Sequence, residues 1–153
     1  MRSLFLIAAL LSAAAVNADN SIQQKSVDLR TVKSNERVVH RDSSGRMSGS
    51  TVRSGDKLVH RDSSGGMLGT STVSGNRTIY RDSSGRITGS STVSGNRIIY
   101  RDSSGRVDVT AQKSGNGTVY RDSSGKVVSR STVSGTQTTF RDGSGRISGT
   151  TRK

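Results

Sequence analysis

Residues 80–99 read YRDSSGRITGSSTVSGNRII, and this block recurs without insertions along most of the chain. Its residues 82–85 (DSSG) fit a type I turn followed by a left-handed glycine, a common three-residue hairpin loop. Residues 94–96 (SGN) supply a second turn from residue types that tolerate positive φ. The segments between the turns, 86–93 and 97–101, are rich in Ile, Val, Thr and Tyr, which favour strands. Each block therefore predicts two strands and two turns.

The block repeats with a period of twenty residues, so equivalent positions form columns. One column is Arg throughout: Arg41, Arg61, Arg81, Arg101, Arg121 and Arg141. The column just before it holds a ring side chain: His40, His60, Tyr80, Tyr100, Tyr120 and Phe140. A fixed period without insertions indicates a repeat architecture in which each unit packs on its neighbours. We therefore predict six β repeats over residues 38–153, preceded by a segment, 19–37, that contains only a degenerate half repeat.

Two all-β architectures satisfy this pattern, an antiparallel meander of hairpins and a β-solenoid with one coil per block. A solenoid would stack identical columns ~4.8 Å apart, which places Arg on Arg and Asp on Asp. Like charges directly opposed destabilise a sheet, whereas a meander separates equivalent strands by about twice that distance. We therefore predict an all-β antiparallel hairpin meander of about a dozen strands. The solenoid is the alternative, and disorder is a third outcome because the composition is polar and charged.

The repeated motif also resembles a known family. Residues 80–87 (YRDSSGRI), recurring every twenty residues, are similar to the YD repeats of bacterial Rhs-type proteins, although an Arg here separates the Tyr from the Asp. The resemblance covers Val38 to about Thr151 and does not include a toxin domain. It implies β-hairpin repeats in a secreted or surface-associated bacterial protein, and it implies little about activity.

The first eighteen residues, MRSLFLIAALLSAAAVNA, have the organisation of a signal peptide. Arg2 provides the positive start, residues 4–16 form a mostly apolar run, and residues 16–18 (VNA) fit the small-residue rule for cleavage. The apolar run is too short to span ~30 Å of hydrocarbon as a helix. We therefore predict a signal peptide over 1–18 and a secreted or periplasmic protein with no transmembrane segment after cleavage.

The residue types that carry enzyme chemistry are scarce. The chain has no Cys and two His, which excludes disulfides, thiolate metal sites and cysteine nucleophiles. Residues 60–62 (HRD) match the start of a kinase catalytic loop, but the Asn expected five residues later and a glycine-rich ATP loop are missing. His40 and His60 stand in the ring column, so we interpret both as packing residues. Each repeated Asp begins a turn, where Asp is favoured for local hydrogen bonds. We predict no enzyme activity, catalytic residue, cofactor, metal or small-molecule substrate.

The charge pattern points to anionic partners. The chain carries 24 Lys or Arg against 11 Asp or Glu, a formal net charge of +13. A second cation column, interrupted by Gly66, follows the first turn: Arg46, Arg86, Arg106, Lys126 and Arg146. On a meander, each column becomes a row of cations ~10 Å apart. One hypothesis is that the two columns bind an anionic polymer, namely polysaccharide, lipopolysaccharide or DNA; for nucleic acid, the Tyr and Phe column offers rings for base stacking. The alternative is that the charged columns are only solvent-exposed strand faces, with no bound ligand.

Stability considerations lead to the leading functional hypothesis. Only 29% of residues are hydrophobic, and burial at ~25 cal/mol per Å² in a single-layer sheet does not offset ~1–2 kcal/mol of backbone entropy per residue. A second layer made by folding over, or self-association through exposed strand edges, is then required. We predict a secreted or surface-associated bacterial protein with a structural or adhesive, self-associating role. The alternative is the polymer-binding module, and the third is an ice-binding surface, because Thr72, Thr92 and Thr132 share a column.

Overall fold

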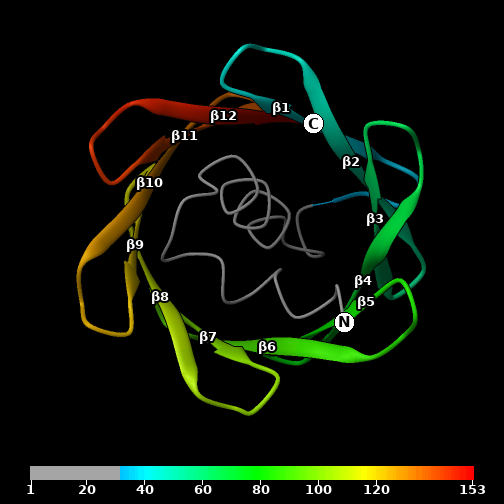
Figure 1. Ribbon diagram of the computed structural model, residues 1–153, viewed down its shortest axis with the longest axis horizontal. Coiled ribbons are helices and arrows are strands. Elements are labelled where there is room, and N and C mark those ends of the chain that lie inside the picture. The colour runs from blue at the N-terminus through cyan, green and yellow to red at the C-terminus, as the bar shows by residue number, and fades with distance from the viewer. Residues whose placement is uncertain (1–31) are drawn as a thin grey trace.

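A computed structural model describes residues 32–153, in which one antiparallel sheet of twelve strands closes on itself as a barrel (Figure 1). Each strand pairs with the next in the chain, and the first also pairs with the last. The strands are β1 (Arg37–Asp42), β2 (Met47–Ser54), β3 (Lys57–Asp62), β4 (Met67–Ser74), β5 (Arg77–Asp82), β6 (Ile87–Ser94), β7 (Arg97–Asp102), β8 (Val107–Ser114), β9 (Gly117–Asp122), β10 (Val127–Ser134), β11 (Gln137–Asp142) and β12 (Ile147–Arg152). The predicted signal peptide, 1–18, lies outside the described residues.

Both predicted turns form, and glycine is required in each. After β5, the Gly85 N–H donates to the Asp82 carbonyl (3.0 Å) with Gly85 at φ +84°, a region that favours glycine. After β6, Ser94 pairs with Arg97 across a two-residue loop whose first residue, Gly95, has φ +56°. Positive φ at the first loop position alone matches a type II′ hairpin turn. Because these turns alternate, the DSSG turns gather at one end of the barrel and the Ser-Gly turns at the other.

A recurring β-bulge gives the sheet its curvature. In the β5–β6 pair, Tyr80 is opposite Gly89 but Arg81 is opposite Ile87, which leaves Thr88 as an extra residue. The same register shift occurs in every pair that is joined by this turn, which reads DSSG in five repeats and DGSG (142–145) in the last. A bulge bends its strand and increases the local twist, and six of them in sequence curl the sheet toward closure.

The closed barrel confirms part of the predicted fold and corrects the rest. The all-β antiparallel hairpin meander is confirmed, and the alternative β-solenoid is wrong because neighbouring strands pair antiparallel through tight hairpin turns. Closure itself was not predicted. It removes the exposed edges expected for an open meander, since β1 and β12 pair with each other. It also creates an enclosed interior, which supplies the missing burial without a second layer or self-association.

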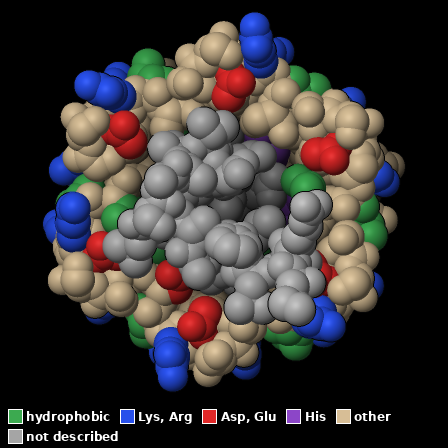
Figure 2. All heavy atoms as spheres, viewed as in Figure 1, with side chains coloured by type: hydrophobic (Ala, Val, Ile, Leu, Met, Phe, Trp, Pro, Cys, Tyr) green, Lys and Arg blue, Asp and Glu red, His purple; other side chains and the backbone are tan. Residues whose placement is uncertain are grey.

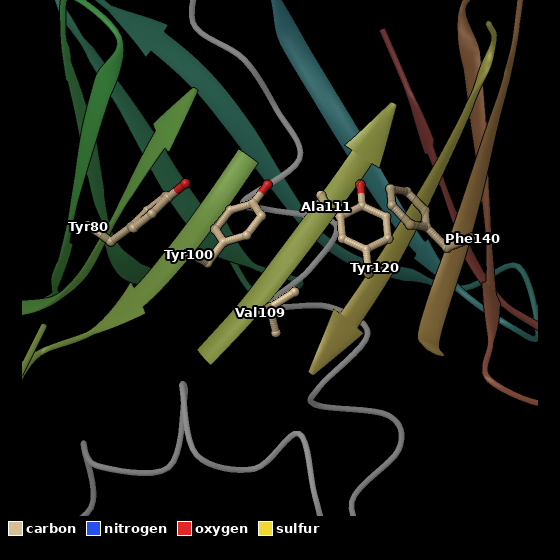
Figure 3. Packing of buried hydrophobic residues seen from close by; sticks show 6 residues of the cluster. All are labelled: Tyr80, Tyr100, Val109, Ala111, Tyr120 and Phe140. Carbon is tan, nitrogen blue, oxygen red and sulfur yellow. The ribbon is translucent and has the colours of Figure 1, made fainter. Parts of the chain in front are cut away.

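Two columns of residues line the interior and alternate around the wall: the ring column on the odd-numbered strands and a column of small residues on the even-numbered strands. The ring column is buried, and each ring pairs across strands with a small residue of the preceding even-numbered strand, as Tyr100 does with Ser91 and Tyr120 with Ala111. Figure 3 shows the four rings of the third to sixth hairpins side by side on the inner wall, together with Val109 and Ala111. Alternation of large and small side chains fills a barrel interior without gaps. The aromatic residues therefore form the larger of two hydrophobic clusters, and Val32, Val38 and Leu58 form the other.

Candidate functional site

The predicted cation columns lie together at one end of the barrel. The first column occupies the ends of the odd-numbered strands, and the second directly follows the DSSG turns, so both flank the same six turns. We call these eleven residues the cation collar: Arg41, Arg46, Arg61, Arg81, Arg86, Arg101, Arg106, Arg121, Lys126, Arg141 and Arg146. All except Arg101 are exposed. Figure 2 shows Lys and Arg at the periphery of this end, outside the acidic side chains.

The first cation column also has a structural role. Each of its six arginines donates an Nη1 hydrogen bond to the carbonyl of the glycine four residues later, as Arg81 does to Gly85 at 2.9 Å. This bond holds the side chain over its own turn and fixes where the guanidinium lies. A guanidinium has five N–H donors, so one such bond still leaves donors for a bound anion. The column therefore combines turn stabilisation with a fixed presentation of positive charge.

The repeated aspartates organise the turns from inside the collar. Asp82 Oδ1 accepts hydrogen bonds from the Ser84 N–H (2.9 Å), the Ser84 hydroxyl (2.6 Å) and the Arg86 N–H (3.0 Å). The serine hydroxyl, followed by backbone N–H groups, lowers the pKa of five of these carboxyls: Asp42, Asp62, Asp82, Asp122 and Asp142. The predicted local role of Asp is confirmed. Within residues 32–153, no His, Cys, Asp and Glu side chains gather in a group that could hold a metal ion.

A second set of cations was missed by the sequence reasoning. Four exposed residues start the first four odd-numbered strands and therefore lie at the Ser-Gly end, opposite the collar: Arg37, Lys57, Arg77 and Arg97. Gly117 and Gln137 replace them in the last two repeats. The same twenty-residue period could have revealed this set. It distinguishes the two ends of the barrel, because only the collar continues around the whole circumference.

The prediction that the aromatic column stacks on nucleic-acid bases is wrong. Tyr80, Tyr100 and Tyr120 are at most 9% exposed and Phe140 is 1% exposed, because strand alternation turns the column inward and the barrel closes over it. Only rings on an accessible surface can stack on bases.

The two histidines form a hydrogen-bonded network inside the barrel. Thr51 Oγ1 lies between the rings, 2.8 Å from His40 Nε2 and 2.9 Å from His60 Nδ1. The other nitrogens reach Thr151 Oγ1 at 3.1 Å, from His40, and Ser71 Oγ at 2.6 Å, from His60. We call these five side chains, on β12 to β4, the histidine sector. The predicted burial of both histidines is confirmed, but the sequence did not indicate that they share a hydroxyl.

The network couples the tautomers of the two rings. A neutral imidazole has one donor and one acceptor nitrogen, and the Thr51 hydroxyl has one hydrogen to donate. If Thr51 donates to His60 Nδ1, it accepts from His40 Nε2, and the terminal contacts then run in the same direction from Thr151 to Ser71. The opposite arrangement reverses every bond. Both arrangements require both rings to be neutral.

Burial keeps the rings neutral. It lowers the pKa of His60 to about 4, and burial together with the nearby His60 lowers the pKa of His40 to about 4. The sector therefore fits hydrogen bonding without charge at neutral pH, and it changes character in acid.

Comparisons with known proteins support the fold. No protein-family model matches the chain, and no curated protein matches it. Among solved structures, it is similar to the X-ray structure of a protein from Arabidopsis thaliana, with a TM-score of 0.55 and 14% sequence identity. The match covers 82% of this chain and 85% of that chain. At this identity the likeness concerns the architecture alone. Within residues 32–153, no helix has the length and hydrophobicity needed to cross a bilayer.

Proposed function

We propose that this protein is an exported β-barrel module that attaches to anionic polymers through the cation collar. The observation that carries the proposal is the arrangement of eleven cations around one end of the barrel, ten of them exposed. Two strands separate equivalent cations, which gives a spacing of ~10 Å along the rim. The chemistry recognised is a series of phosphate or carboxylate groups, as in DNA, lipopolysaccharide or acidic polysaccharide, because planar guanidinium groups match these oxyanions.

The collar offers a continuous positive rim rather than a pocket. Six Asp side chains offset part of its charge, but each uses Oδ1 to hold its own turn. Figure 2 shows acidic side chains inside the Lys and Arg side chains at this end. A polymer lying along the outside of the rim meets the cations first. Such attachment also fits an adhesive role for an exported protein. The self-associating structural role stays a prediction, since the closed barrel presents no unpaired strand edge.

The threonine column gives less support to the ice-binding hypothesis. Thr72, Thr92 and Thr132 lie on β4, β6 and β10 around a curved wall, with Gln112 on β8 between the last two. Their hydroxyls therefore face different directions, whereas an ice plane needs a flat array.

The test compares two variants with the same change in net charge. The collar variant replaces Arg46, Arg86, Arg106 and Arg146 with Gln, and the matched control replaces Arg37, Lys57, Arg77 and Arg97 with Gln. Affinity for a DNA duplex and for heparin is measured at increasing salt and neutral pH. We expect the wild type to lose affinity steeply with salt, and the collar variant to have a smaller slope, by ~0.9 for each phosphate contact removed on duplex DNA.

The control variant should keep most of the wild-type affinity and slope. Equal losses in both variants would show that total charge, rather than the collar, attracts the polymer, and would contradict the proposal. Salt-independent binding, or no binding by the wild type, would contradict it as well. Circular dichroism of both variants checks that the barrel is intact.

A further inference from the structure

The junction between β1 and β12, which we call the seam, differs from every other strand pair in the barrel. It holds four residue pairs in register, whereas each of the other eleven junctions holds five or six. The other junctions are each joined by a tight turn, but the two seam strands meet from opposite ends of the described chain. The seam therefore has the fewest backbone pairs and no covalent link to hold it together.

The histidine sector spans this seam. His40 on β1 contacts Thr151 on β12, 111 residues away, and through Thr51 it connects to His60 on β3. When both rings carry a proton, all four ring nitrogens become donors, and Thr51 Oγ1 must accept from two cations while its own hydrogen loses both ring acceptors. Like charges separated by a single hydroxyl group repel strongly in a buried setting. Both charges lie on the β1–β3 side of the seam, so protonation destabilises the wall directly beside the junction with the fewest backbone pairs.

The charged groups around the rings do not remove this effect. Among the described residues of β12, β1, β2, β3 and β4, strand alternation places three charged side chains on the inner face: Asp42, Asp62 and Arg53. Each Asp lies two residues, or ~7 Å along the strand, beyond its histidine. Asp42 Oδ1 is already bound to its own turn, as is Asp62 Oδ1. Arg53 lies toward the Ser-Gly end, where its Nη1 donates to the Val32 carbonyl, and its charge adds to the repulsion.

We propose that the seam is an acid-sensitive closure: in acid the barrel opens between β1 and β12, and the released edges pair with those of further copies of this chain. The closed barrel already demonstrates that the two edges are complementary in sequence, register and direction. An open strip pairs its β12 with the β1 of the next copy in the same register. Such head-to-tail pairing produces rings or filaments. The low pKa of both histidines agrees with opening near pH 4.

The partner in this proposal is a second copy of the chain, and the proposal does not depend on polymer binding. Polymer attachment is measured on the closed barrel at neutral pH, and assembly is measured in acid without any polymer. Either one can therefore fail without the other.

The first experiment locks the seam. Val39 and Arg152 are partners across it, and the chain has no Cys, so V39C/R152C can form one defined disulfide. The matched control, T92C/I99C, joins the corresponding positions of β6 and β7 and leaves the seam unlocked. Sedimentation velocity is recorded at neutral pH and at about pH 4. We expect wild type and oxidised control to change from monomers to assemblies of several chains, and the oxidised seam variant to stay monomeric until it is reduced.

The second experiment removes the trigger. The variant H40Q/H60Q replaces both rings with neutral side chains that still donate and accept hydrogen bonds. We expect it to stay monomeric at the pH where the wild type assembles. Assembly of the oxidised seam variant, assembly of H40Q/H60Q at the wild-type pH, or a wild type that stays monomeric at about pH 4 would each overturn the proposal. If circular dichroism at neutral pH shows that H40Q/H60Q does not fold, the comparison of oxidised V39C/R152C with oxidised T92C/I99C still tests whether the seam opens.

Discussion

The inner wall of the barrel carries the same two columns all the way round, but different side chains fill them in its two halves. In the histidine sector the rings are imidazoles, each hydrogen-bonded at both nitrogens to Thr or Ser. In the aromatic half, Tyr80, Tyr100, Tyr120 and Phe140 pack beside Val109 and Ala111. The hairpins have equivalent turns and registers in both halves and only the seam departs from them, so the side chains of the ring column set how each half responds to pH. The packing of the aromatic half therefore does not change between neutral pH and mild acid, whereas the stability of the histidine sector depends on pH.

Acid should produce the largest difference between the two halves. The pKa of each histidine is about 4 in the folded barrel and 6.5 in the unfolded chain, so the unfolded chain binds more protons below pH 6.5. Stability is therefore unaffected above about pH 6.5 and falls as the pH drops toward 4, by ~3 kcal/mol per histidine. Urea unfolding of oxidised V39C/R152C, which we expect to stay monomeric, measures this loss. In the same background, H40Q/H60Q should lose most of the pH dependence between pH 6.5 and 4; an unchanged slope would assign it to other groups.

Truncation of the aromatic half should cause the next largest effect. Phe140 is 1% exposed, so Phe140→Ala removes a buried ring and leaves a cavity, at a cost of ~3–5 kcal/mol. The loss should be the same at pH 7 and pH 5, because no titrating group is involved. Urea unfolding at both pH values checks this. The control Ile147→Ala, at a residue 48% exposed, should cost less than ~1 kcal/mol. Similar losses in both variants would indicate that the column is not the core.

A smaller effect is expected from the polar edge of the aromatic half. The Tyr80 hydroxyl lies 3.0 Å from Ser91 Oγ, so Tyr80→Phe removes this hydrogen bond and should cost ~1 kcal/mol. The double variant Y80F/S91A removes both polar groups and should recover part of that loss. Thermal unfolding of the two variants and the wild type measures the difference. A double variant that is less stable than the single one would mean that Ser91 has a separate packing role.

The smallest effect concerns the outside of the barrel, where both halves share the same collar. Arg81→Gln removes the hydrogen bond to the Gly85 carbonyl, and we expect it to lower stability by less than ~1 kcal/mol. Arg86→Gln serves as the matched control, because Arg86 is an exposed arginine on the other side of the same turn. It should leave the melting temperature unchanged. Differential scanning fluorimetry of the two variants measures this contrast. Equal melting temperatures would show that the arginine bonds do not stabilise the turns.

Much of the local structure could be predicted from the chain. The DSSG and Ser-Gly turns, the strands between them and the ring column all follow from residue types at fixed spacing, and all are present in the structure. Burial of His40 and His60 could be predicted because they occupy a column of aromatic residues. Their contacts could not, since Thr151 approaches His40 only after the ends of the sheet have met. The prediction of base stacking failed for the same reason, because an open meander leaves accessible the column that a closed barrel buries.

By itself, the sequence determined the hairpins, their antiparallel order and the twenty-residue register of every column, because turn chemistry and strand propensity act over a few neighbouring residues. Closure of the sheet into a barrel, by contrast, is a property of the whole fold and could not be predicted from any single repeat. Closure depends on the curvature summed over six bulges, and each bulge is a register shift of one residue between partner strands, such as Thr88 against β5. That sum brings β1 to β12, encloses a core in a chain with few hydrophobic residues, and places His40 at the seam. It also arranges the positive charge of the chain as a rim around one end of the barrel.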